Sequence, residues 1–284
     1  LLAADHDGYA RLALGRSILR VHRRTLLIAL VLAALVIGLA LVAMTWGDYP
    51  LSVPEVIRAL VTDQGFVSTI VIDWRLPRVL AAVLFGAALG VSGALFQTLT
   101  RNPLGSPDVI GFSTGAYTGA IISITVVGAN VLSEMAGALI GGLAAALLVY
   151  VLAWRGGVQG FRLIIVGIAV TAVLSSLNTY LLLRAQTEVA MAASLWGAGS
   201  IALVGWSDLA LAVPVLAVCG VLTACVVPPL RQLELGDDAA HAHGVRTEPV
   251  RIAVLVAGVA LIAIVTALTG PIAFIALAAP QITK

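Results

Sequence analysis

The strongest constraint in this sequence is a set of apolar runs long enough to cross a lipid bilayer. Val79 to Leu99 gives 21 residues without a charge, bounded by Arg78 and Arg101. A hydrocarbon core about 30 Å thick needs about 20 helical residues, and an arginine at its centre costs about 2.5–3.5 kcal/mol. We therefore expect the two arginines at opposite faces of a membrane. Hydrophobic residues make up 61% of the chain and charged residues 11%, which is typical of an all-α polytopic membrane protein.

Several further runs have the same character. The last of them continues without a charge to Thr283, and Gly270-Pro271 breaks it. We expect about seven spans plus the start of the next, a tail at 1–24, a membrane domain at 25–284, and a native protein that continues beyond Lys284. The predicted spans are 25–45, 79–99, 109–128, 132–154, 161–183, 209–229 and 252–269.

The arginines predict the orientation, because cytoplasmic loops of membrane proteins are rich in positive charge. Five arginines precede the first span, which places the N-terminus in the cytoplasm. Counting spans then places the segment 46–78 outside, 184–208 outside and 230–251 inside. Arg75 and Arg78 are exceptions on the outer side, and such an exception is either ordinary variation or a sign of function. The cations assigned to the inner side are Arg11, Arg16, Arg20, Arg23, Arg24, Arg101, Arg155 and Arg162.

The sequence lacks the residues that several kinds of chemistry require. Lys284 is the only lysine, so the usual ATP-binding loop is absent. The middle parts of the spans carry no acid or histidine, which disfavours both a membrane enzyme and an ion-coupled carrier. His241 and His243 lack further ligands nearby, and we expect no metal site. A net charge of +2 gives no reason to expect nucleic acid as a partner.

The inner segment 228–248 is a candidate contact for another protein. Asp237 and Asp238 follow Gly236 and can cap a short helix at 238–243, which ends at Gly244. Such a helix outside the bilayer offers a surface that a partner's groove could hold, although a solvated connector has the same pattern.

Polar side chains concentrate in the span 161–183 and in the outer stretch after it. In a membrane these groups either bond to neighbouring helices or line a water-filled pathway. The aromatic residues near 193–206 fit a short interfacial helix. The candidates for a translocation pathway are Ser175, Asn178, Thr179, Trp196 and Ser200.

Five ordered motifs from about residue 25 onward resemble the FecCD/BtuC-type permeases, the membrane subunits of ABC importers for ferric siderophores, haem and cobalamin. The form of several of them is most similar to ferric enterobactin permeases. The motifs are Arg75-Leu-Pro-Arg78, the run from Gly86 to Gln97, the turn from Arg101 to Gly111 with Asn102 and Pro103, the segment from Leu235 to Val245, and the stretch from Gly270-Pro271 to Pro280.

The resemblance implies a ten-span BtuC-like permease fold in the bacterial cytoplasmic (inner) membrane, with a pathway between two permease subunits that form a heterodimer or a homodimer. It implies two copies of an ATP-binding subunit, which carry ATP and Mg, so that the chain itself is neither an enzyme nor a cofactor protein. Arg75 and Arg78 would dock an extracytoplasmic siderophore-binding protein through its glutamates. The residues implied in ATPase coupling are Leu235, Gly236, Asp237, Asp238, Ala240 and Gly244.

Alternatives to ferric siderophore uptake stay open at this point. The substrate could be cobalamin or haem, and a channel or facilitator would need no ATPase at all. The sequence also departs from the family at its end, where Pro280-Gln281-Ile-Thr-Lys284 stands in place of the common Pro-His-Ile-Ala-Arg. The roles of Gln281 and Lys284 are therefore left open.

Overall fold

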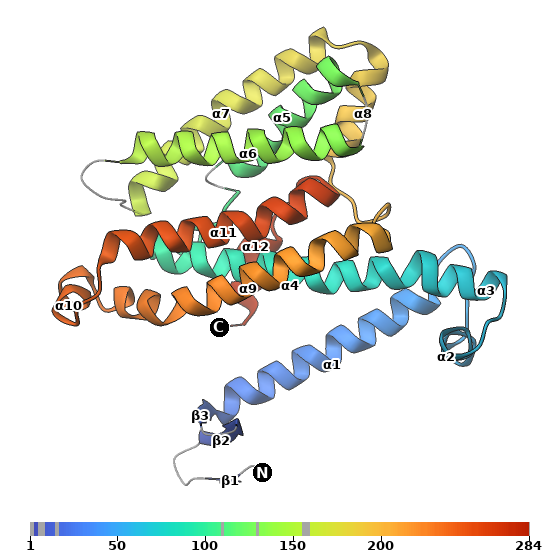
Figure 1. Ribbon diagram of the computed structural model, residues 1–284, viewed down its shortest axis with the longest axis horizontal. Helices are drawn as coiled ribbons and strands as arrows, with labels where there is room; N and C mark the ends of the chain where they lie inside the picture. Colours follow the sequence, from blue (N-terminus) through green and yellow to red (C-terminus); the bar gives the residue numbers. More distant parts are fainter. Residues whose placement is uncertain are drawn as a thin grey trace. The chain divides into compact units, whose positions relative to one another are not determined.

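Figure 1 shows the computed structural model of the chain, which describes residues 3–4, 9–14, 17–108, 111–128, 131–154 and 160–283. Arg16, Arg155, Lys284 and residues 109–110 of a predicted span lie outside these ranges. The chain divides into two compact units, Leu1–Val79 and Leu80–Ile282.

The first unit begins with three short antiparallel strands, which the prediction of an all-α chain did not include. From Arg23 onward the regular elements described in the unit are helices, joined by loops at 46–52 and 62–65. Its elements are β1 (Ala3–Ala4), β2 (Tyr9–Leu14), β3 (Ser17–His22), α1 (Arg23–Thr45), α2 (Val53–Val61), α3 (Phe66–Ser68), the π-helix η1 (Thr69–Arg75) and the start of α4 (Leu76–Thr100).

The amphipathic helix α2 closes a small core in this unit. Ser52 and Glu55 fix its first turn, because the Glu55 carboxylate accepts hydrogen bonds from the Ser52 amide at 2.7 Å and from the Ser52 hydroxyl at 2.6 Å. One face of α2 then buries Val56 and Ala59. The other buried members of this core are Met44, Leu51, Ile70 and Val71.

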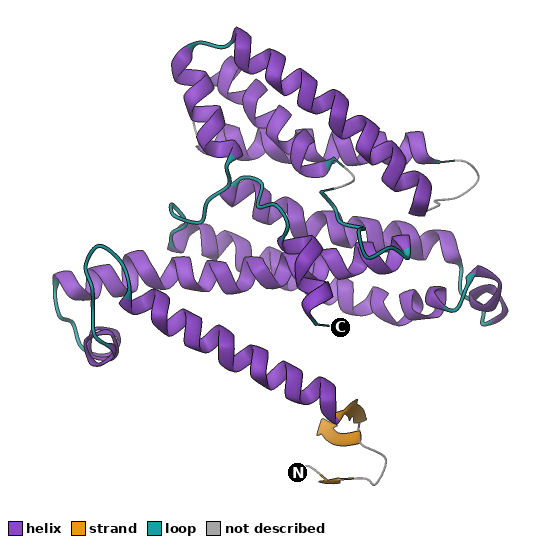
Figure 2. Cartoon of the chain, turned by 180° about the vertical axis from the view of Figure 1, so that it is seen from behind, coloured by secondary structure: helices purple, strands orange, loops and turns teal. Residues whose placement is uncertain are grey.

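The second unit is a helical bundle with α11 at its centre. Two-thirds of the apolar window of α11 is buried, and the helix packs against α5, α6 and α9 (Figures 1 and 2). The Ser92 hydroxyl on α4 donates to the Gly258 carbonyl of α11 at 2.7 Å. The elements are α4, α5 (Phe112–Val127), α6 (Val131–Ala153), α7 (Gly160–Arg184), α8 (Thr187–Gly197), α9 (Trp206–Glu234), α10 (Asp237–Ala242), α11 (Thr247–Thr269) and α12 (Ile275–Ile282).

Each of the seven predicted apolar runs coincides with a helix. Among the described residues, six helices are long and apolar enough to span a membrane, one fewer than the seven predicted spans. The exception is α5, which has 16 residues and a length of about 24 Å. Gly111 at φ 79° and Gly128 at φ 98° bound it, and a backbone in that region cannot continue a right-handed helix. The predicted break at Gly270-Pro271 is confirmed, since α11 ends at Thr269.

Helices α5 and α6 are in direct backbone contact. A Cβ added to Gly119 would lie 2.0 Å from the Gly137 carbonyl oxygen, and one added to Gly141 would lie 2.3 Å from the Gly115 carbonyl oxygen. Glycines four residues apart permit this approach, because they place no side chain between the two backbones. Gly86 on α4 differs, since no described atom outside its own stretch of helix lies within 4 Å of its added Cβ.

We predict that Gly119→Ala destabilises the protein and that Gly86→Ala does not. Both changes favour helix by about 1 kcal/mol, so that the difference between them isolates the methyl clash, for which overpacking costs about 1–3 kcal/mol or more. Thermal unfolding of the two purified variants in the same detergent measures this difference. Equal midpoints would contradict the packing described here.

Candidate functional site

The two arginines of the Arg-Leu-Pro-Arg motif have different surroundings. Arg75 is half-buried, and its guanidinium donates to the Met44 carbonyl at 2.7 Å and to the Tyr49 carbonyl at 2.5 Å. Met44 lies in the last turn of α1, so Arg75 neutralises a free helix C-terminus. Arg78 is exposed. Of the predicted docking pair, Arg75 therefore holds its own unit together, whereas Arg78 presents its charge to solvent.

The other end of α4 is closed by a Schellman turn with an arginine in the left-handed position. Arg101 has φ 50°, its amide donates to the Thr98 carbonyl at 3.2 Å, and the Asn102 amide donates to the Gln97 carbonyl at 3.1 Å. This position usually holds glycine, because a side chain there costs about 1–2 kcal/mol. The Asn102 side chain accepts from the Leu104 amide at 2.9 Å and shapes the turn that follows.

Asp108 lies further along the same turn and is partly buried. Burial raises the pKa of its carboxyl, and the hydrogen bond that the Ser113 hydroxyl donates to it at 2.5 Å acts in the opposite direction. This acid thus ties the turn to the first turn of α5.

The short helix of the segment 228–248 is present as α10, one residue earlier than predicted. Gly236 at φ 109° and Gly244 at φ 79° provide the turns at its two ends. The Val245 amide donates to the Ala240 carbonyl at 2.9 Å, and Ala240 is fully buried. Capping by an aspartate side chain was expected, but no side-chain hydrogen bond caps α10.

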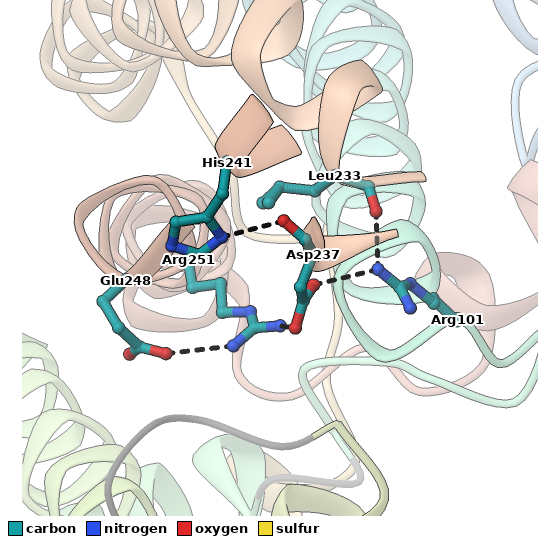
Figure 3. Close-up of polar contacts among 6 residues, drawn as sticks. All are labelled: Arg101, Leu233, Asp237, His241, Glu248 and Arg251. Carbon is teal, nitrogen blue, oxygen red and sulfur yellow. Dashed lines mark hydrogen bonds and ion pairs between the residues drawn. The ribbon is translucent and has the colours of Figure 1, made fainter. Parts of the chain in front are cut away.

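Asp237 uses its carboxylate in a different way, shown in Figure 3. One oxygen lies 3.1 Å from Arg101 and the other 2.7 Å from Arg251, which in turn contacts Glu248 at 2.9 Å. We call these four residues the Asp237 clamp. Arg101 also donates to the Leu233 carbonyl in the last turn of α9 at 2.5 Å. Asp238, by contrast, is exposed and forms no ion pair among the described residues.

The candidate pathway residues do not form one cluster. Asn178 is buried and donates to the Thr114 carbonyl of α5 at 3.4 Å, whereas Ser175 and Thr179 are exposed on α7. Trp196 stacks on Tyr117 with ring centroids 6.3 Å apart, and Ser200 is exposed. These residues occupy two helices, α7 and α8, and the loop after α8. Among the hydrogen bonds described, one joins two of them, from the Thr179 hydroxyl to the Ser175 carbonyl at 3.0 Å within α7.

An apolar groove of about 460 Å³ runs between α5 and α6 and reaches Leu174 of α7. Its few polar side chains include Thr118 and Ser123, whose hydroxyls donate to the carbonyls of Thr114 and Ser133. The groove therefore offers almost no free polar group to a charged solute.

The residues after α11 are tied to α4 by amide side chains. Gln97 donates to the Leu277 carbonyl at 3.0 Å, and Gln281 donates to the Gln97 side chain and, at 3.4 Å, to the Pro103 carbonyl. Pro280 is buried within α12, and Gly270 adopts φ 71° beside the Trp196 carbonyl. The residue that departs from the common histidine thus joins α12 to the end of α4.

Metal binding finds no support in the described ranges, which hold no group of three histidine, cysteine or acidic residues close enough to share an ion. The His241 ring instead lies 2.8 Å from the Asp237 carbonyl through Nδ1.

Comparison with known proteins identifies the family. The model of the FecCD transport family matches residues 30–284. The chain belongs to this family. All the polar sites described above lie within the matched range, including the Asp237 clamp and both arginines at the start of α4.

Two relatives and one solved structure are similar to this chain over most of its length. The ferric enterobactin transport system permease protein FepG of Escherichia coli K12 is 44% identical over 265 residues, covering 93% of this chain and 80% of the relative. The achromobactin transport system permease protein CbrC of Dickeya dadantii is 35% identical to this chain. The match covers 93% of this chain and 75% of the relative. A solved structure of a metal-chelate type ABC transporter in an inward-facing conformation superimposes with a TM-score of 0.78 at 27% identity, covering 88% of this chain and 78% of that one.

Sequence reasoning missed the partners of Asp237. A local signal exists for Glu248 and Arg251, which stand three residues apart on one helix. Arg101 is 136 residues from Asp237, and no sequence pattern links the two.

We predict that Arg75→Met loosens residues 44–52, whereas Arg78→Met leaves them unchanged. Hydrogen bonds to a charged group contribute about 1.5–3 kcal/mol each, and Arg75 donates two of them within its unit. Amide hydrogen exchange of the purified variants should show faster exchange in this segment for Arg75→Met alone. The same exchange in both variants would mean that the two arginines are structurally equivalent.

Proposed function

We propose that this chain is the transmembrane permease subunit of an ATP-driven ABC importer that takes up ferric siderophore, of the catecholate type, delivered by a binding protein. The observation that carries this proposal is the 44% identity to a ferric enterobactin permease over 93% of the chain. Relatives named for achromobactin and ferric citrate support the wider class of ferric chelates. A hemin permease of Yersinia pestis is 35% identical over 74% of the chain, which makes haem uptake the second candidate.

The complex would contain a second permease subunit and two copies of an ATP-binding subunit, which would supply ATP and Mg. Two distinct permeases of Escherichia coli K12, FepG and FepD, carry the same transport-system name, and FepD is 36% identical to this chain. This pairing supports a heterodimer. A facilitator without an ATPase would leave α10 without a partner.

The arrangement would place the chain in the bacterial inner membrane with its N-terminus in the cytoplasm. Arg78 would then face the binding protein, and α10 would face the ATP-binding subunits. ATP-driven movement of α10 would shift the helices between outward-open and inward-open states, as alternating access requires. Ser175, Asn178, Thr179, Trp196 and Ser200 would contribute to a pathway completed by the second permease.

Uptake of radiolabelled iron tests this function. A strain lacking the gene should lose uptake of ferric enterobactin and regain it from a plasmid copy, while haem and cobalamin uptake stay unchanged. An ATP-binding subunit should copurify with the tagged chain. Normal ferric enterobactin uptake without the gene would reject the substrate, and transport without any ATP-binding partner would favour a facilitator.

We predict that Arg78→Glu slows docking of the loaded binding protein by about tenfold at low salt, with a smaller effect at high salt, because exposed charges steer association. Arg58→Glu is the matched control, since Arg58 is exposed in the same unit and the variant has the same net charge. Stopped-flow or surface-based binding kinetics give the rates. Equal rates for both variants would remove Arg78 from the docking surface.

A further inference from the structure

A single carboxylate joins the ends of four helices in the second unit. Asp237, the first residue of α10, contacts Arg101 just after α4 and Arg251 in the second turn of α11, and Arg101 also binds the Leu233 carbonyl at the end of α9 (Figure 3). Glu248 balances the second charge of Arg251. The Asp237 clamp thus contains two cations and two anions and is neutral as a whole.

The backbone at Arg101 is unusual in a way that serves this contact. Its left-handed conformation ends α4 and directs the next residues into the turn, and glycine would adopt it more easily. Arg101 instead provides a guanidinium that donates to both Leu233 and Asp237. Unfavourable backbone geometry retained at such a position indicates that the side chain has a role.

The chain that connects α9 to α10 is less rigid than a continuous helix. Pro228 and Pro229 lie inside α9 and have no amide hydrogen, so two hydrogen bonds of the helix ladder are missing just before its last turns. Gly236 then turns the chain at φ 109°. Movement of α10 relative to the body of α9 is therefore easier than in an unbroken helix, and the clamp is the polar connection from α10 to α4 and α11.

The clamp is also accessible to solvent. The side chains of Arg101 and Asp237 are 52% and 44% exposed, whereas that of Arg251 is 17% exposed. A partly solvated ion pair exchanges partners more readily than a buried one, because water can replace each contact. Arg251 is the fixed side of the clamp, and the Arg101 contact is the one that can open and close.

We propose that Asp237 is the positioning residue that transmits movement of α10 to α4 and α11, and that Asp238 is not. The inference rests on the proposed function, because α10 is the element that ATP-binding subunits would move. The two neighbouring acids therefore have different roles. Asp237 forms contacts within the chain, whereas Asp238 is exposed. Loss of Asp237 leaves two guanidinium groups without their shared anion, so α10 loses its charged side-chain link to both helices together.

The test uses the complete complex, purified with its partner subunits, its ATP-binding subunit and its binding protein, and reconstituted in proteoliposomes with ferric enterobactin as the probe. ATP hydrolysis and iron transport are measured in the same preparation. Asp237→Asn should lower iron transported per ATP about tenfold with ATP hydrolysis retained within about twofold, as expected when a coupled contact is lost. Asp238→Asn is the matched control for charge: because Asp238 is exposed on α10, any effect through the ATP-binding subunit falls on ATP hydrolysis itself, and iron transported per ATP should stay unchanged.

Two further variants separate positioning from general damage. Asp237→Glu keeps the charge and should recover most of the ratio. Arg101→Met combined with Asp237→Asn should lower the ratio by clearly less than the two single effects multiplied, because the two residues share one contact while the bond from Arg101 to Leu233 is separate. Equal ratios for Asp237→Asn and Asp238→Asn would overturn the proposal, as would additive losses in the double variant. If the Asp237→Asn complex does not assemble, Arg101→Met, which leaves the Arg251 contact intact, decides in its place by the same ratio.

Hydrogen exchange distinguishes failure of this inference from failure of the proposed function. In the nucleotide-free complex, amide exchange in α10 should be about tenfold faster in Asp237→Asn than in Asp238→Asn, whatever the substrate is. Absence of iron transport by the unaltered complex would reject the substrate while the exchange result still tests the clamp. Unchanged exchange in α10 would reject the clamp even if iron is transported.

Discussion

Exclusion of charge from hydrocarbon decides where this chain can form polar contacts. Within a bilayer the helices must satisfy their own backbone groups, so the free carbonyls and the charged side chains meet at helix ends. Arg75 binds the last turn of α1, and Arg101 binds the last turn of α9. The two arginines at opposite ends of α4 therefore have the same physical task, which is to neutralise the negative end of another helix.

The sequence was sufficient for the parts of the fold that depend on local pattern. Every apolar run forms a helix, and the breaks at Gly236, Gly244 and Gly270 lie where the sequence predicts them. The number of spanning helices does not follow from hydrophobicity alone, because the left-handed glycines at 111 and 128 limit α5 to 16 residues. Local sequence patterns thus predict that a helix forms better than they predict the residues at which it begins and ends.

The roles of individual charges could not be predicted in the same way. Arg75 and Arg78 are three residues apart and chemically identical, yet Arg75 is engaged by carbonyls 31 and 26 residues away while Arg78 is exposed. Asp237 and Asp238 differ similarly, since the partner of Asp237 on α4 is 136 residues distant. Which of two adjacent like charges is engaged depends on tertiary contacts, and the residue pattern alone carries no information about them.

The glycine contact between α5 and α6 has a consequence for motion. Side chains can change rotamer when helices slide, but Gly115, Gly119, Gly137 and Gly141 bring backbone against backbone and leave nothing to adjust. Because sliding one helix along the other would press backbone atoms together, we expect the two helices to move as a unit. Displacement is left to elements joined by softer links, of which the proline-interrupted end of α9 is the clearest example.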